Sequence, residues 1–161
     1  MTVRNITAMT AYIMILVMAD YILTPIPGFQ VIMLLIFVMA KSFKSIEAFL
    51  IVLVYVLIDN FLYGGIGIYT IPMVIGWLII VFILKAFKEK NIKGHIMALI
   101  SIPMSFVYTL PFMIFNVLIY DIKIIPYIIA DFPFTLGIIL SSYLTIDLFY
   151  DRIITVMKNI I

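Results

Sequence analysis

Long apolar runs fill most of this chain, and only short polar stretches separate them. Of its 161 residues, 66% are hydrophobic and 11% are charged, and the mean hydropathy is +1.32. A soluble fold of this size needs a polar exterior, which this composition cannot supply. The sequence therefore predicts an integral membrane protein surrounded by the lipid bilayer.

The runs predict an all-α protein with six transmembrane helices, forming one domain over residues 1–161. A bilayer core needs about 17–25 apolar residues per helix, and the alternation typical of transmembrane strands is not found in the sequence. Stretches rich in proline and glycine mark the reversals between runs. The expected helices are about Ile6–Leu23, Phe29–Ala40 (a short one), Ile46–Tyr63, Tyr69–Phe87, His95–Ile119 and Pro133–Met157.

The distribution of lysine and arginine predicts the orientation, because cytoplasmic loops are enriched in both. If six helices span and both termini are cytoplasmic, nine of the 10 basic residues lie in the cytoplasm and only Lys123 lies outside. Arg4 and Lys41 then share a side, which supports the short second helix. The first apolar run lacks a small-residue cleavage pattern, so we expect it to be retained.

Three acids, Asp20, Asp59 and Asp131, would lie near the outer ends of the first, third and sixth helices. Ionisable side chains in membrane segments are costly and point to function. Their common level suggests a shared, outward-facing cavity. The alternative is that each carboxylate is hydrated among the lipid headgroups and has no further role.

Aromatic and amide side chains could complete such a pocket. Tyr55, Asp59 and Tyr63 recur every four residues and therefore share a helix face. Trp77 and Asn116 lie deeper in their helices and favour a pocket lining, whereas Tyr63 fits an interfacial aromatic belt better. The candidate solute-binding residues are Asp20, Asp59, Asn60, Tyr63, Trp77, Asn116 and Asp131.

Small residues mark one face of the first expected helix. Thr7 and Ala11 are four residues apart, and Ala8 lies beside Ala11. Small side chains let helices approach closely, so this face suits a partner helix. Packing within the chain would use the same spacing.

The sequence lacks the residues that most enzyme chemistry requires. It has no cysteine and a single histidine, His95, which leaves little material for a metal site. Neither a phosphate-binding G-x-x-x-x-G-K-[ST] loop nor H-E-x-x-H is present, so the chain does not hydrolyse ATP itself. We expect no enzymatic activity, no metal, no cofactor and no nucleic-acid partner.

Several stretches, in this order, resemble the substrate-binding S components of energy-coupling factor (ECF) vitamin transporters. The expected six helices, cytoplasmic ends and short second helix are also similar to that family. The stretches are "PIPGFQ" (Pro25–Gln30), "LIDNFLYGG" (Leu57–Gly65), "IGW" (Ile75–Trp77) and "YIIADFPFTL" (Tyr127–Leu136).

This resemblance implies a subunit of the prokaryotic plasma membrane that binds a vitamin or related micronutrient in an outward-facing pocket. It further implies docking on a transmembrane coupling subunit, which carries two ATPase subunits, and delivery of the solute inward. The family docks through two alanines four apart on its first helix, for which Thr7 and Ala11 are the nearest match. Where many relatives carry histidine and asparagine after Pro-Phe-x-Leu, this chain has Ile138 and Ser142, so that role is not carried over.

The last of these stretches also predicts a helix start. Proline in the first turn of a helix loses no hydrogen bond, and a helix dipole favours an acid near the N-terminus. We therefore expect Pro133 to open the last helix, with Asp131 beside its N-terminus.

A second family remains an alternative. "LIDNFLYGGIGIY" (Leu57–Tyr69) also resembles the six-helix, MreD-type membrane scaffolds of the cell-wall elongation machinery, which transport no solute. A ligand-sized cavity at Asp59 and Trp77 would favour solute binding, whereas close packing there would favour the scaffold.

Overall fold

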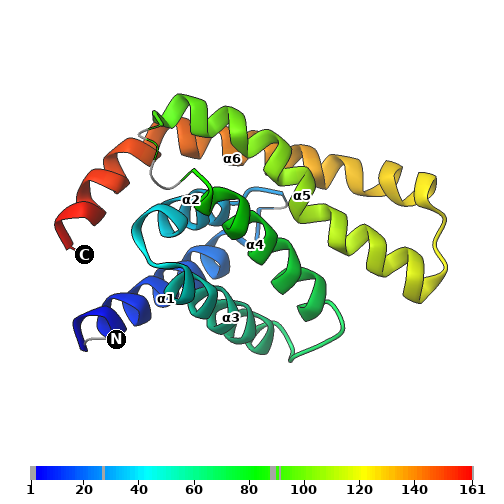
Figure 1. Ribbon diagram of the computed structural model, residues 1–161. Coiled ribbons are helices and arrows are strands. Elements are labelled where there is room, and N and C mark those ends of the chain that lie inside the picture. The colour runs from blue at the N-terminus through cyan, green and yellow to red at the C-terminus, as the bar shows by residue number, and fades with distance from the viewer. Residues whose placement is uncertain (1–2, 27, 88–89, 91, 161) are drawn as a thin grey trace.

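The computed structural model describes residues 3–26, 28–87, 90 and 92–160, which form six helices and no strand (Figure 1). Pro27 of the "PIPGFQ" stretch and the basic residue Lys88 lie outside these ranges. The all-α prediction is confirmed for the described part of the chain. The helices are α1 (Val3–Leu23), α2 (Ile32–Ser42), α3 (Ser45–Leu62), α4 (Thr70–Lys85), α5 (Gly94–Tyr120) and α6 (Ile124–Ile160).

Four helices of the described chain, α1, α3, α5 and α6, are long and apolar enough to cross a membrane. The other two are shorter, with 11 residues in α2 and 16 in α4. At 1.5 Å per residue, α2 is only about 17 Å long, well short of a bilayer core of about 30 Å. The chain is therefore a helical membrane protein by length and composition, with two helices too short to count as full spans.

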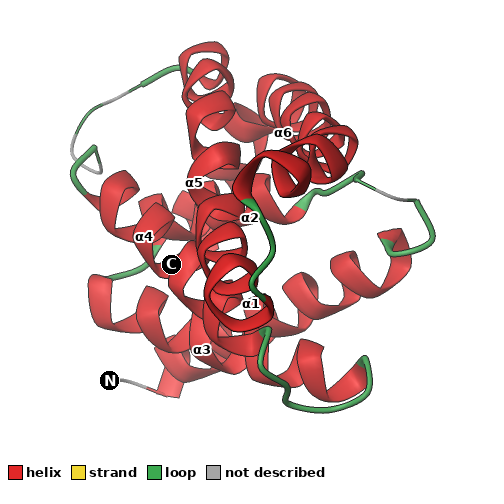
Figure 2. Ribbon diagram, turned by 90° about the vertical axis from the view of Figure 1, so that its right-hand side faces the viewer, coloured by secondary structure: helices red, strands yellow, loops and turns green. Residues whose placement is uncertain are grey.

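Helix α2 forms the centre of the core. Every residue from Ile32 to Ala40 is buried, and α2 packs against α1, α3, α4 and α6 (Figure 2). A helix that is apolar on all sides belongs in an interior. The Tyr12 hydroxyl of α1 donates a 2.7 Å hydrogen bond to the Leu35 carbonyl, which ties α1 to this central helix.

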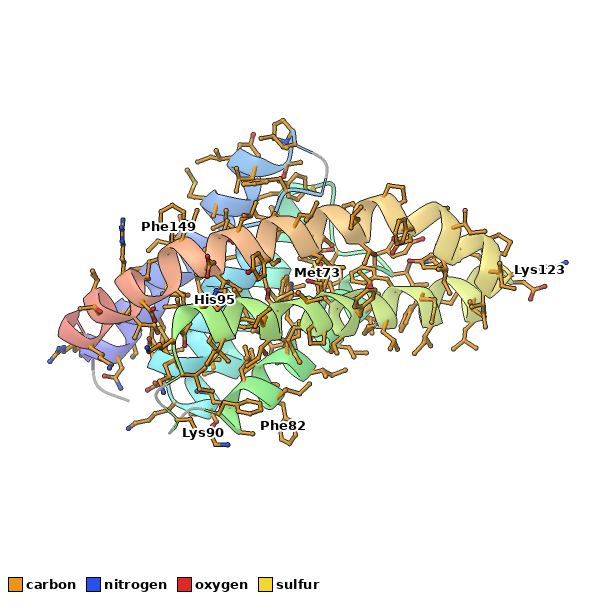
Figure 3. The ribbon with its side chains drawn as sticks, turned by 90° about the horizontal axis from the view of Figure 1, so that it is seen from above. Met73, Phe82, Lys90, His95, Lys123 and Phe149 are labelled. Carbon is orange, nitrogen blue, oxygen red and sulfur yellow. The ribbon has the colours of Figure 1, made fainter. Side chains whose placement is uncertain are left out.

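Helices α5 and α6 form a long antiparallel pair whose far tip reaches well beyond α1 (Figures 1 and 3). The expected start of the last helix at Pro133 is wrong. Helix α6 begins at Ile124 and Pro133 lies inside it, so Asp131 is several residues from the helix N-terminus and cannot be explained by the dipole there. Prolines are tolerated in membrane helices because neighbouring groups satisfy the freed backbone atoms, and α5 likewise contains Pro103 and Pro111.

The loop between α1 and α2 is fastened to the middle of α6. Gly28 has a positive φ of 74°, and a Cβ placed on it would lie 3.2 Å from the Gly137 Cα. The Ser141 hydroxyl accepts a 3.0 Å hydrogen bond from the Gln30 N–H. Two facing glycines thus let the loop backbone lie directly on the helix backbone.

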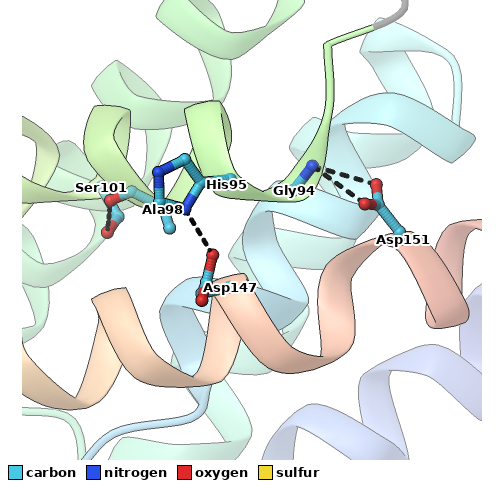
Figure 4. Close-up of polar contacts among 6 residues, drawn as sticks. All are labelled: Gly94, His95, Ala98, Ser101, Asp147 and Asp151. Carbon is cyan, nitrogen blue, oxygen red and sulfur yellow. Dashed lines mark hydrogen bonds and ion pairs between the residues drawn. The ribbon is translucent and has the colours of Figure 1, made fainter.

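The start of α1, the α2–α3 and α4–α5 connections and the end of α6 lie at one end of the bundle, with both chain termini (Figure 1). This end is here called the basic end, because these segments contain Arg4, Lys41, Lys44, Lys85 and Lys158. Lys41 Nζ donates to the Lys90 carbonyl at 2.7 Å, which joins the α2–α3 and α4–α5 connections. The N-terminus of α5 is held by α6, because both Asp151 carboxylate oxygens accept from the Gly94 N–H at 3.0 and 3.1 Å (Figure 4).

Beside that contact, His95 Nδ1 lies 2.9 Å from Asp147 Oδ1 (Figure 4). Lys123 lies at the opposite end of the molecule (Figure 3). Basic side chains of the described chain are therefore strongly polarised along the bundle axis.

Candidate functional site

Helices α1, α3, α4 and α5 bring together an acidic and aromatic cluster, here called the closed cluster. Its members are Asp20, Tyr55, Asp59, Trp77 and Tyr108. The Tyr55 hydroxyl donates a 2.7 Å hydrogen bond to Asp20 Oδ2, and the Asp59 carboxyl faces that of Asp20. Tyr55 and Asp59 are one turn apart on α3, so the predicted shared face is confirmed for these two residues.

A close approach of α4 and α5 positions the aromatic half of the closed cluster. A Cβ on Gly76 would lie 3.0 Å from the Tyr108 carbonyl oxygen, so a side chain there would push the two helices apart. The next residue, Trp77, packs against Tyr108 with ring centroids 4.2 Å apart and ring planes tilted by 33°. Tyr108 in turn contacts Phe112, one turn further along α5.

Two polar atoms of the closed cluster stand out because they are buried and unpartnered. Among the described residues, Asp59 Oδ1 and Trp77 Nε1 have no hydrogen-bond partner. Asp59 is only 5% exposed and Trp77 only 1%. Leaving a buried donor or acceptor unpaired costs about 1–3 kcal/mol, and such groups require an explanation, for example an absent ligand or water.

The closed cluster is nevertheless tightly packed. The Trp77 and Tyr108 rings occupy the space between α4 and α5, and the larger cavities of the described chain are lined by other residues. Asp59 and Trp77 therefore do not line a ligand-sized cavity in this conformation.

Asn60, next to Asp59, connects α3 to the start of α4. Its Oδ1 accepts a 2.9 Å hydrogen bond from the Thr70 hydroxyl. Its Nδ2 donates to the Val56 carbonyl at 2.9 Å and lies 3.3 Å from the Met73 sulfur. These contacts give Asn60 a structural role at the α3–α4 connection, and its role in solute binding stays a prediction.

A second polar group lies in a groove between α5 and α6, here called the outer groove, with a volume of about 270 Å³. Its polar lining consists of Thr109, Tyr127, Asp131 and Thr135. Asp131 is half-buried, and its Oδ2 accepts a 2.7 Å hydrogen bond from the Thr135 hydroxyl one turn along α6. Asp131 thus belongs to a separate site from Asp20 and Asp59.

Asn116 bridges the α3–α4 loop to this second group. Its Oδ1 accepts from the Tyr69 hydroxyl at 3.1 Å, and its side chain also lies within hydrogen-bonding reach of Tyr127. The Tyr69 and Tyr120 rings stack with centroids 6.3 Å apart. The neighbouring Tyr120 hydroxyl raises the pKa of Tyr69 above its ordinary value, so Tyr69 stays neutral at physiological pH.

Tyr63 belongs to neither group. It is 46% exposed, hydrogen-bonds through its hydroxyl to Thr24, and has its ring 6.3 Å from that of Tyr21. The seven candidate solute-binding residues are therefore divided among the closed cluster, the outer groove with Asn116, the α3–α4 connection with Asn60, and the surface.

The predicted docking face of α1 is open. Thr7 and Ala11 are exposed, whereas Ala8 is partly buried. The Thr7 hydroxyl donates to the Val3 carbonyl at 3.1 Å, so this helix face presents carbon atoms and a satisfied hydroxyl to its surroundings. Docking of a coupling subunit on this face stays a prediction.

Sequence reasoning missed Tyr108, the residue that joins the acids to Trp77. The signal was present, because Tyr108, Phe112 and Asn116 recur every four residues and therefore share one face of α5. Thr135 was also missed, although it stands one helical turn after Asp131.

Comparisons of the chain with protein-family models, with curated proteins and with solved structures found no match. The function must therefore be inferred from the site and from the sequence motifs.

Proposed function

We propose that this chain is a solute-binding S component of an ECF-type importer, and that it captures a small, vitamin-like molecule at the closed cluster. One observation carries the proposal. Asp59 Oδ1 on α3 and Trp77 Nε1 on α4 are buried polar atoms without a partner among the described residues, and a bound solute would satisfy both.

The chemistry of the closed cluster favours a flat ring that is cationic or carries an amine. The carboxyls of Asp59 and Asp20 would attract the positive charge, and the faces of Trp77 and Tyr108 would stabilise it through cation–π contacts. The indole N–H would donate to an acceptor on the solute. Capture proteins of this type bind with nanomolar to micromolar affinity, roughly −8 to −12 kcal/mol.

The charge distribution supports an outward-facing site. Lysine and arginine favour the cytoplasmic side, so the basic end is assigned to the cytoplasm. Asp20 and Asp59 lie near the other ends of α1 and α3, which places the closed cluster in the outer half of the membrane. In this orientation both chain termini are cytoplasmic.

The proposal requires the closed cluster to open. Trp77 and Tyr108 must separate before a solute can contact Asp59, so the packing described above represents a solute-free state. Delivery inward would then use a coupling subunit with two ATPase subunits, docked through the exposed Thr7 and Ala11 face of α1.

The deciding experiment is mass spectrometry of small molecules released by denaturing the detergent-purified chain, combined with thermal-shift assays against a panel of vitamins and precursors. We expect one stoichiometric solute, or a rise in melting temperature with one compound. Asp59→Asn should abolish the effect, and Asp131→Asn in the outer groove should preserve it. An empty protein that no compound stabilises would overturn the proposal.

One observation favours the alternative, an MreD-like membrane scaffold without a solute. Asp59 and Trp77 are packed shut rather than exposed in a cavity, as a purely structural core would be. If the chain is a scaffold, no compound of the vitamin panel should raise the melting temperature of the native chain or of the Asp59→Asn and Asp131→Asn variants. A solute response that depends on Asp59 would exclude this alternative.

A further inference from the structure

A cavity larger than the outer groove lies near the basic end, between the first turns of α3 and the last turns of α4. It is here called the inner groove, and its volume is about 980 Å³. This volume lies at the upper end of the range of about 300–1,000 Å³ typical of small-molecule sites. Its lining includes Ser45 and Phe49 of α3, Leu78, Phe82 and Lys85 of α4, and Phe87 just beyond the end of α4.

The inner groove fits within one membrane leaflet. Its lining follows α4 from Leu78 to Lys85 and ends at Phe87, just beyond the helix. The seven steps within α4 rise about 10 Å at 1.5 Å per residue. One leaflet supplies about half of a hydrocarbon core of about 30 Å. Phe82 is 81% exposed and Phe49 41%, so the groove walls are apolar and open to the surroundings.

Positive charge gathers where the groove meets the basic end. Lys44 and Lys85 both lie close enough to the buried Glu47 carboxylate to act on it electrostatically. Lys90 lies over the Phe87 ring, 5.5 Å from its centroid. Among the described residues around the mouth of the groove, these three cations outnumber the single carboxylate of Glu47, so this part of the chain is net positive there.

We propose that the inner groove binds one anionic phospholipid. An acyl chain would lie along α4 from Phe87 toward Leu78, and the headgroup phosphate would face Lys44 and Lys85. Basic pockets between membrane helices recognise anionic headgroups in this way. A transmembrane helix of a partner protein would cross both leaflets and would need a longer contact surface. The inner groove ends within one leaflet, which fits a lipid better. This proposal depends on membrane insertion and not on the proposed solute.

A tryptophan reporter tests the proposal in the full-length chain, reconstituted in vesicles. Phe82→Trp places the reporter in the inner groove, and Phe149→Trp on α6 is the matched control. Both positions are exposed, each stands three residues before a basic residue, Lys85 or Arg152, and they lie on different sides of the molecule (Figure 3). The native Trp77 is only 1% exposed and contributes a constant background.

Quenching is compared between phosphatidylglycerol and phosphatidylcholine with brominated chains, each at the same small fraction in a phosphatidylcholine bilayer. We expect at least a threefold preference for the anionic lipid at position 82 and a clearly smaller one at position 149. Equal quenching by both lipids at position 82 would overturn the proposal, and would indicate ordinary boundary lipid or a site for another partner.

Charge variants then test the headgroup contact in the Phe82→Trp background. Lys44→Gln should bring the preference close to one, since about 1 kcal/mol per basic residue near an anionic surface corresponds to a loss of up to about fivefold. It keeps the backbone N–H that Glu47 accepts at 2.9 Å, so the helix start is preserved. Lys123→Gln at the far end and Arg152→Gln on α6 should leave the preference unchanged. Equal losses in all three variants would reduce the effect to general surface charge and overturn the specific site.

Discussion

The closed cluster and the outer groove contain the same kinds of side chain in two different environments. Each has a carboxylate that accepts a 2.7 Å hydrogen bond from a hydroxyl, Tyr55 to Asp20 in the first and Thr135 to Asp131 in the second. In both sites the donor is buried and the acceptor is half-buried, but the closed cluster also encloses the buried Asp59 and Trp77, whereas the outer groove is open and its Phe132 is exposed. We therefore expect the packing around each hydrogen bond, rather than the bond itself, to decide how strongly the fold depends on it.

The largest contrast is expected for aromatic truncation. Trp77→Ala in the closed cluster should lower the free energy of unfolding by about 3 kcal/mol, because it removes the ring that packs against Tyr108 and leaves a cavity. Phe132→Ala in the outer groove, at a residue that is 57% exposed, should change it by less than about 0.5 kcal/mol. Equilibrium unfolding in mixed detergent micelles measures both. Equal losses would remove the distinction between the two sites.

Removing one hydroxyl from the closed cluster should have the next largest effect. Tyr55→Phe deletes a fully buried donor to Oδ2 of the half-buried Asp20. It should destabilise the chain by about 1–3 kcal/mol, the cost of leaving a desolvated carboxylate oxygen unpaired. Tyr21→Phe, at a ring that is 58% exposed, is the control and should be nearly neutral. A neutral result for Tyr55→Phe in the same unfolding assay would show that water satisfies Asp20.

Asp59→Asn should act in the opposite direction and stabilise the fold by about 1 kcal/mol, because it replaces the repulsion between two facing carboxylates with a neutral amide that can donate to Asp20. A stabilising change at a site required for function is a common trade-off. Thermal melting of the solute-free protein measures the gain. A lower melting temperature would indicate that the Asp59 carboxyl is needed for packing, which would weaken its assignment to solute binding.

The smallest effect is expected at Thr135→Val. This change removes the donor to Asp131 and preserves the side-chain volume, and the half-buried carboxylate can find another donor in the open groove. The unfolding free energy should fall by less than about 0.5 kcal/mol, since replacement of an accessible hydrogen bond is nearly neutral. A loss as large as that of Tyr55→Phe would show that the outer groove is closed in the membrane.

The six helices could be predicted from the apolar runs, whereas the surroundings of each helix could not. Lipid tails are as apolar as leucine, so hydropathy is the same for a helix that faces lipid and one that faces protein. This explains why α2 was expected as a short span and is instead buried on every side. The start of α6 was missed because a proline was taken as a helix boundary, although membrane helices accommodate proline in their interior.

The candidate site was predictable only within single helices. Four-residue spacing correctly placed Tyr55 and Asp59 on one face of α3, because that relation is local. A common depth in the membrane grouped Asp131 with Asp20 and Asp59, yet depth gives no direction around the bundle axis. Asp131 points into the groove between α5 and α6, and Tyr108 of α5 takes the place beside the acids.

The glycines of the two outer loops have different consequences for how this sequence can change. A Cβ at Gly28 would lie 3.2 Å from the Gly137 Cα, so a side chain there would push the loop away from α6. A Cβ at Gly64 or Gly65 would meet nothing within 4 Å, and only the positive φ of each residue disfavours a side chain. The α1–α2 connection is therefore fixed in length and path, and it sets how far the end of α1 can move from α6. The α3–α4 connection can accept insertions, so it is the position at which related chains could acquire new outer contacts without disturbing the core.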